Sequence, residues 1–171
     1  MIKVETVFDK EFTLTLQIIL VGCIALCVSS MYMRFIKNYK IKKKIRGMTE
    51  AAAEYTPAQF MWLRRQRFGT KNKKSYALEH NFPGVYILLN KTKNMYYVGQ
   101  GKEVINRINC HFTGKGNGDV YHDYKSGDQF AIRIIPLKKS GFKTLNELEK
   151  NTIMTYDSYY EGYNKTRGNK G

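Results

Sequence analysis

The chain is poor in the residues that build disulfide scaffolds and zinc sites. Only three of its 171 residues are cysteine, and only three are histidine. Cys23 and Cys27 lie in an apolar run, Cys110 stands apart from them, and no C-x-x-C motif occurs. Both kinds of site need closely spaced ligands, so the sequence argues against a disulfide framework and against structural zinc.

Acidic side chains are scarce as well. The chain has 14 Asp and Glu against 29 Lys and Arg, a formal net charge of +15. Its length predicts one domain with extensions, and its charge favours an anionic partner, either nucleic acid or lipid head groups. A basic surface without a specific partner is the plain alternative. The charge is concentrated in residues 34–79, which hold 13 basic and 3 acidic side chains.

One segment has no charge at all. Residues 12–33, FTLTLQIILVGCIALCVSSMYM, contain no Asp, Glu, Lys or Arg. As a helix, a segment of this length spans about 33 Å, enough for the hydrocarbon core of a bilayer. Residues 12–33 are therefore predicted to form a transmembrane helix after a short extracytoplasmic N-terminus, residues 1–11. A buried core helix is the alternative, but no second segment is apolar enough to cover it.

Two processing signals compete with a membrane span. A cleaved signal peptide needs a positively charged start, whereas residues 1–11 are slightly acidic. The sequence LVGC, ending at Cys23, is similar to a bacterial lipoprotein box, which would make Cys23 a lipidated N-terminus. Against this, the chain stays apolar for ten residues after Cys23.

The flanks of the apolar segment predict its orientation. Seven basic residues follow it between Arg34 and Arg46, and two precede it. By the positive-inside rule, the C-terminal part of the chain then lies in the cytoplasm. The basic cluster at 34–46 is expected to bind anionic lipid, at about 1 kcal/mol per basic residue near the surface, or to touch DNA phosphates.

Residues 34–79 as a whole are interpreted as a basic juxtamembrane linker with one helix. Thr56 is a candidate N-cap for that helix, and Pro57 suits its first position. The helix could lie on the membrane, pack against a domain or contact nucleic acid. The stretch GTKNKKS at 69–75 is predicted to be a flexible basic loop.

From residue 80 onward the pattern predicts a small α+β domain, residues 80–171. GVYILLN at 84–90 and MYYVG at 95–99 predict an antiparallel hairpin with a four-residue loop. A helix with apolar residues at helical spacing follows, and GKGNGD ends it. QFAIRIIPL predicts a third strand. The last helix is expected to have Thr144 as N-cap, with Glu147 completing a capping box.

Polar side chains are expected to converge on this small sheet. Arg107 and His111 lie four residues apart, so they share one face of their helix. If that face meets the hairpin, Tyr86 and Tyr97 join them in a polar pocket.

The domain resembles the GIY-YIG nuclease family over residues 83–168, about half of the chain. GVY at 84–86 and YVG at 97–99 are similar to the two namesake triplets, with Val in place of Ile in both. The family's remaining signature positions match, in order, Arg107, His111, Glu149 and Asn164. The resemblance implies a three-stranded antiparallel sheet flanked by helices and metal-dependent hydrolysis of DNA or RNA phosphodiesters.

The residue chemistry agrees with what the resemblance implies. Arg107 offers a fixed positive fork to a phosphate. Glu149 offers one hard oxygen ligand, which suits Mg²⁺, with Mn²⁺ as a substitute. Such a metal is a Lewis acid for the scissile phosphate and the leaving oxygen.

The remaining roles come from the family. Tyr86 is the implied general base, and because its usual pKa is about 10 it needs Arg107 and a metal to favour the phenolate. Tyr97 and His111 would orient the water, contact the phosphate or relay the proton. Asn164 would hold the glutamate or the pocket wall. Taken singly, these are also ordinary strand tyrosines and solvated helix residues.

The sequence thus predicts a membrane-anchored endonuclease facing the cytoplasm. That placement favours action on DNA entering the cell, as in phage or plasmid defence, superinfection exclusion or processing of imported DNA. A catalytically silent tether that binds nucleic acid at the membrane is the second hypothesis. A basic lipid-binding membrane protein is the third, and it leaves residues 84–168 unexplained.

Overall fold

The computed structural model describes residues 2–68 and 74–168, and the chain divides into two units, residues 1–41 and 42–171. The first unit is the N-terminal part of helix α1 (Ile2–Ala51). Among the described residues, this is the one helix long and apolar enough to cross a membrane. A lone helix cannot cover its own side chains, and residues 12–33 are exposed. Most of the loop expected at 69–75 lies outside the described residues.

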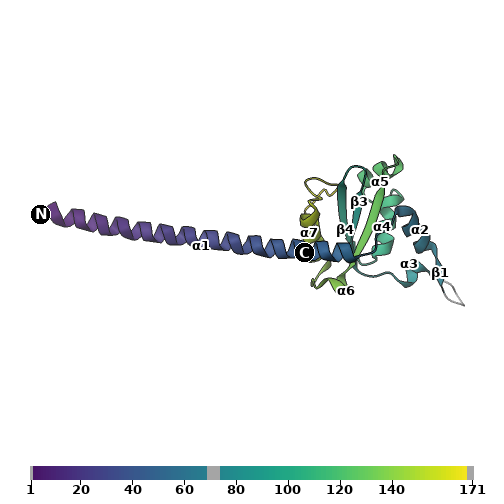
Figure 1. The fold of residues 1–171 in the computed structure, drawn as a ribbon, viewed down its shortest axis with the longest axis horizontal. Coiled ribbons are helices and arrows are strands. Elements are labelled where there is room, and N and C mark those ends of the chain that lie inside the picture. The colour runs from purple at the N-terminus through teal and green to yellow at the C-terminus, as the bar shows by residue number, and fades with distance from the viewer. Residues whose placement is uncertain (1, 69–73, 169–171) are drawn as a thin grey trace. The chain divides into compact units, whose positions relative to one another are not determined.

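The second unit has the predicted α+β fold (Figure 1). It begins with residues 42–51 of α1. The further elements are α2 (Pro57–Arg65), β1 (Arg67–Phe68), β2 (Lys74–Ser75), α3 (Tyr76–Glu79), β3 (Gly84–Asn90), β4 (Met95–Gly101), α4 (Val104–Phe112), α5 (Gly118–Lys125), β5 (Phe130–Pro136), α6 (Leu137–Ser140) and α7 (Leu145–Tyr156).

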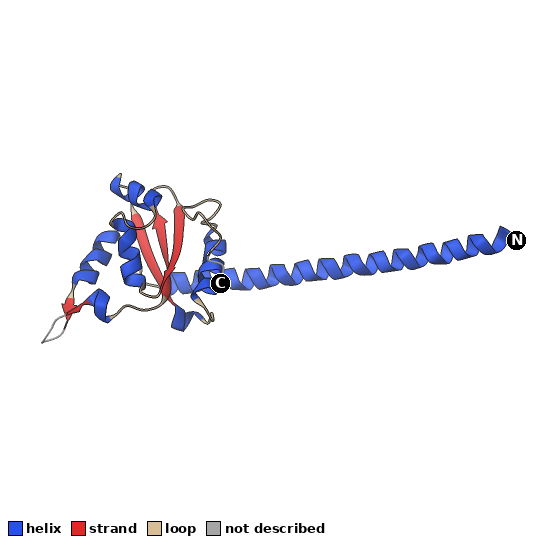
Figure 2. Ribbon diagram, turned by 180° about the vertical axis from the view of Figure 1, so that it is seen from behind, coloured by secondary structure: helices blue, strands red, loops and turns tan. Residues whose placement is uncertain are grey.

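Three of these strands form an antiparallel sheet in the order β4-β3-β5. Strands β3 and β4 make the predicted hairpin, with the loop at residues 91–94. Strand β5 pairs with β3 over its whole length. Figure 2 shows helices on both sides of this sheet, as expected for the α+β fold.

Helix α4 covers one face of the sheet and helps to form the main hydrophobic core. Tyr86 and Leu88 of β3 are fully buried in this core. The apolar spacing predicted for α4 is confirmed, because Ile105, Ile108 and Phe112 are all buried there.

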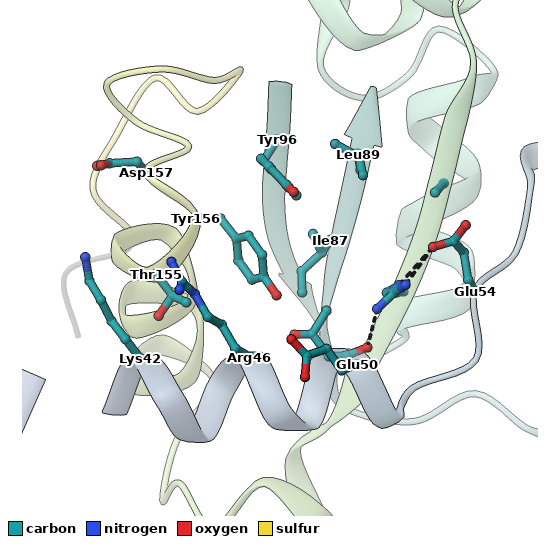
Figure 3. Close-up of a pocket in the computed structure, with 13 residues that line it drawn as sticks. Lys42, Arg46, Glu50, Glu54, Ile87, Leu89, Tyr96, Thr155, Tyr156 and Asp157 are labelled. Carbon is teal, nitrogen blue, oxygen red and sulfur yellow. Dashed lines mark hydrogen bonds and ion pairs between the residues drawn. The ribbon is translucent and has the colours of Figure 1, made fainter. Parts of the chain in front are cut away.

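Helix α7 and the end of α1 lie over the opposite face. Figure 3 shows Arg46 and Glu50 of α1 on the side of the sheet where Ile87 lies. Ile45 is fully buried, and Thr49 is 4% exposed. Residues 42–51, which the sequence assigned to a linker, therefore contribute to the core of the second unit.

The turn after α1 is fastened to β5. Arg133 Nη1 donates to the Thr49 carbonyl at 2.9 Å, and Arg133 Nη2 contacts the Glu54 carboxylate at 2.8 Å. Tyr55 and Ile132 exchange two backbone hydrogen bonds, at 3.0 and 2.8 Å. The chain is thus fixed on this strand before α2 begins.

The predicted helix starts are confirmed in one case and partly wrong in the other. Thr56 and Gln59 form a capping box at the start of α2, with Pro57 at its first position. Thr144 caps α7 by accepting the Glu147 N–H at 3.1 Å. The Glu147 carboxylate, however, accepts from the N–H of Lys143, one residue before the cap, so the reciprocal bond expected there is wrong.

Candidate active site

The two tyrosine triplets meet across the β3–β4 pair. Tyr86 lies opposite Gly99, and Tyr97 lies opposite Leu88. Opposite residues of an antiparallel pair share a face, so both tyrosines lie on the α4 side. A Cβ at Gly99 would lie 2.3 Å from the Tyr86 hydroxyl oxygen. The glycine of the second triplet therefore makes room for the tyrosine of the first.

Helix α4 places its two polar residues in different surroundings. Arg107 is exposed, and within residues 2–68 and 74–168 its guanidinium makes no ion pair. His111 is fully buried, with Nε2 2.7 Å from the Tyr86 hydroxyl. Because no part of His111 reaches solvent, it is not positioned to contact a phosphate, which was one of its three expected roles.

The second nitrogen of His111 fixes its tautomer. The Asn117 backbone N–H donates to His111 Nδ1 at 3.0 Å, so Nδ1 is the acceptor. A neutral imidazole has one acceptor and one donor nitrogen. Nε2 therefore carries the hydrogen and donates to the Tyr86 oxygen. In this tautomer His111 stabilises negative charge on Tyr86 and cannot take its proton.

Burial governs the protonation of these buried groups. It raises the pKa of Tyr86 well above its usual range, and although Arg107 lowers that pKa, burial is the larger effect. Burial also raises the pKa of Tyr97. Burial, with a smaller contribution from the Arg107 charge, lowers the pKa of His111 to about 4. At neutral pH Tyr86 keeps its proton and His111 is neutral.

Helix α7 brings Glu149 to the same place. Its carboxylate is largely buried, and Gln100 Nε2 donates to its Oε2 at 3.1 Å. The same Gln100 nitrogen donates to Asn146 Oδ1 at 2.6 Å. Gln100 thereby ties the end of β4 to the first turns of α7 and orients the carboxylate.

The residues present fit one hard cation. Among the described residues, no group of three or more His, Cys, Asp and Glu side chains could hold a metal ion. A single carboxylate suits Mg²⁺, which keeps several of its waters and takes further ligands from a bound phosphate. Glu149 is the residue that would hold it.

Asn164 has a structural position beside the cavity. Its Oδ1 accepts the Val98 N–H at 2.9 Å, and its Nδ2 donates to the Val98 carbonyl at 2.8 Å. The side chain thus pairs with the free edge of β4 as a neighbouring strand would. Asn164 was expected either to hold Glu149 or to hold the pocket wall. These contacts favour the second role.

A cavity of about 230 Å³ unites five of the six predicted residues. Its lining includes Tyr86, Tyr97, Arg107, Glu149 and Asn164. His111 lies behind Tyr86 and outside this lining. The catalytic roles of all six residues stay predictions, but their convergence over the sheet is observed.

Sequence reasoning missed two polar residues that support the site. Gln100 directly follows the YVG triplet, and this adjacency was a signal in the sequence that could have identified it. Asn117 holds the His111 ring and caps α5, accepting the N–H groups of Asp119 and Val120. The stretch GKGNGD that contains it was interpreted only as the end of the preceding helix, although an Asn before an acidic first turn is typical of a helix start.

Comparison with known proteins agrees with this geometry. No curated protein and no solved structure matches the chain. Residues 82–164 match the family model described as the GIY-YIG catalytic domain, and this stretch begins just before β3 and ends at Asn164. By this match, residues 82–164 of the chain belong to the GIY-YIG catalytic domain family.

Proposed function

We propose that this chain is a membrane-anchored endonuclease that hydrolyses DNA phosphodiesters with a divalent cation, Mg²⁺ or Mn²⁺. The observation that carries the proposal is the cavity shared by Tyr86, Arg107 and Glu149. It combines a proton acceptor, a phosphate-binding cation and a metal ligand, the parts that phosphodiester hydrolysis requires. The family match supports a nuclease-type function.

Arg107 and Glu149 act on the negative charge of the phosphate in two different ways. The exposed Arg107 binds the scissile phosphate and offsets the negative charge that develops on it. Glu149, oriented by Gln100, holds the divalent cation. When bound, that cation supplies Lewis-acid polarisation of the phosphate and of the leaving oxygen.

Tyr86 is the proposed general base, in its phenolate form. The neutral His111 donates its Nε2 hydrogen to the Tyr86 oxygen and thereby stabilises the phenolate. Arg107 lowers the pKa of Tyr86 and acts in the same direction. Because burial keeps that pKa high overall, only a small fraction of Tyr86 is ionised at neutral pH. Hydrolysis should therefore accelerate as the pH rises.

Tyr97 and Asn164 complete the pocket. The Tyr97 ring lies 6.2 Å from the Tyr86 ring, centroid to centroid, and both residues line the cavity. There it orients the attacking water. Asn164 keeps the edge of β4, and with it Tyr97 and Gly99, in position.

The N-terminal part of the chain is the proposed anchor. In this proposal residues 1–11 are extracytoplasmic, residues 12–33 span the bilayer, the basic residues 34–46 contact anionic lipid and the nuclease domain faces the cytoplasm. The helical, apolar character of residues 12–33 supports the span. At this position the enzyme meets nucleic acid that enters the cell, so defence against phage or plasmid DNA is the proposed role.

The test uses the full chain, purified in a non-ionic detergent. Supercoiled plasmid, linear duplex and RNA are incubated with it in the presence of Mg²⁺, Mn²⁺ or a chelator. Cleavage of DNA that needs the cation supports the proposal. DNA binding without cleavage under every condition would favour the catalytically silent tether instead.

A further inference from the structure

The rim of the cavity carries one lysine that lies just beyond the residues matched by the family model. Lys165 lines the cavity together with Arg107 and Glu149. It directly follows Asn164, whose side chain is bonded twice to the backbone of β4. The backbone of Lys165 is therefore fixed at the cavity, while its long side chain can turn.

A single carboxylate holds the head of this side chain. Lys165 Nζ lies 2.5 Å from Asp119 Oδ2, at the start of α5, and this is the one ion pair of Lys165 within the described chain. The two side chains are 75% and 54% exposed. An ion pair this exposed contributes little to stability, so another anion can replace Asp119 at little cost.

The start of α5 and the segment that carries Lys165 are already joined without this ion pair. Asn117 Nδ2 donates to the Tyr163 carbonyl at 3.0 Å, and the Asn117 N–H holds His111. Both contacts lie deeper than the exposed pair. The Lys165–Asp119 contact is therefore dispensable for holding α5 in place.

We propose that Lys165 is a second phosphate-binding residue of the site, and that Asp119 occupies it until the DNA backbone replaces the carboxylate. The inference rests on the proposed nuclease function. Arg107 and Lys165, which both line the cavity, would contact the scissile phosphate and a neighbouring phosphate of the same strand. Nucleic-acid binding then exchanges one exposed ion pair for another, with release of counterions.

The test measures binding of a fluorescein-labelled DNA duplex to the full chain in detergent, in a Glu149→Gln background that prevents cleavage. Lys165→Ala should weaken binding by about 3- to 10-fold and reduce the slope of log K against log salt by about 0.9. Asp119→Asn should tighten binding by about 2- to 5-fold, the range that corresponds to losing an exposed ion pair. Lys165→Arg should preserve affinity.

Matched controls separate this exchange from general charge effects. Lys91→Ala removes a lysine from another exposed ion pair, and Glu50→Gln removes an exposed carboxylate on the opposite side of the sheet. In the Lys165→Ala background, Asp119→Asn should tighten binding no more than Glu50→Gln does. Thermal unfolding of each variant checks that the fold is retained, and Lys165→Gln replaces Lys165→Ala if that variant unfolds.

The signs of the two effects decide the outcome. If both single variants weaken binding, the pair is a structural tie and the inference is wrong. An effect of Lys165→Ala no larger than that of Lys91→Ala also overturns it. If the parent chain, with Glu149 intact, binds and cleaves DNA in either case, the proposed function survives. If the parent chain neither binds nor cleaves DNA, both fail.

Discussion

The buried half and the exposed half of the site are built in opposite ways. Tyr86 and His111 are fully buried and joined by a 2.7 Å contact, and a backbone N–H fixes the imidazole. Arg107 and Lys165 are exposed residues that also line the cavity. Groups that handle a proton need a fixed orientation, whereas groups that bind a long anionic chain must be reachable. Substitutions in the buried half should therefore change the rate, and those in the exposed half should also change affinity.

The largest effect is expected at Glu149, which belongs to neither half and would hold the cation. Glu149→Ala should reduce DNA cleavage to the detection limit while DNA binding survives, because phosphate attraction is spread over many basic groups. Glu147→Ala, on the exposed side of the same helix, is the matched control. Normal turnover of Glu149→Ala, measured on plasmid with Mg²⁺, would remove Glu149 from the mechanism.

Arg107 tests the exposed half. Arg107→Ala should lower the cleavage rate at saturating DNA by at least about 10²-fold, the scale of one charge-stabilising group, and should weaken binding as well. Lys102→Ala, an exposed lysine between β4 and α4, is the control. A loss of affinity with an unchanged maximal rate would limit Arg107 to binding.

Gly99 tests whether the buried half depends on close packing. A methyl group at this position would lie 2.3 Å from the Tyr86 hydroxyl, which His111 holds in place. Gly99→Ala should displace the Tyr86 ring and lower the rate by about 10- to 10²-fold, with affinity for DNA nearly unchanged. Gly118→Ala, where a Cβ meets open space, should have almost no effect. Full activity of Gly99→Ala would mean that the position of the Tyr86 hydroxyl does not matter.

The smallest change is expected on salt washing of membranes. If residues 12–33 span the bilayer, the full chain should remain in the membrane fraction in high salt and in alkaline carbonate. A chain that starts at residue 34 should be released by high salt, because only screened charge then holds it. Protease added outside intact cells should not reach the nuclease domain. Digestion of the nuclease domain from outside would contradict the proposed orientation and would favour lipidation at Cys23.

The sequence predicted the sheet and its main helices because their signals are local. The β3–β4 hairpin, the apolar spacing of α4 and the caps of α2 and α7 follow from alternation, turns and capping residues. The packing of residues 42–51 was not predictable in this way. Their basic side chains dominate the sequence, and the burial of Ile45 depends on a sheet whose first strand begins only at Gly84.

The sequence predicted which residues form the site, but it did not predict their burial or the resulting pKa shifts. The order of the triplets and of Arg107, Glu149 and Asn164 identified residues that do line one cavity. Whether His111 is exposed or buried depends on how α4 packs, which helical spacing alone does not specify. For the same reason, the sequence anticipated that Arg107 lowers the pKa of Tyr86 but not that burial raises this pKa by more than Arg107 lowers it.

The central claim, that Tyr86 is the base and reacts as a phenolate, is tested most directly by the pH dependence of cleavage. The maximal rate of the full chain with Mg²⁺ would be measured from about pH 6.5 to about pH 9, beside Tyr86→Phe. The control is Tyr124→Phe, a tyrosine of α5 that packs against the core and does not line the cavity. Because the pKa of Tyr86 lies above this range, the rate should rise about tenfold per pH unit. Tyr86→Phe should be at least about 10²-fold slower and should lose this slope. A Tyr86→Phe variant that keeps both the rate and the slope would contradict the account and assign the base to another group.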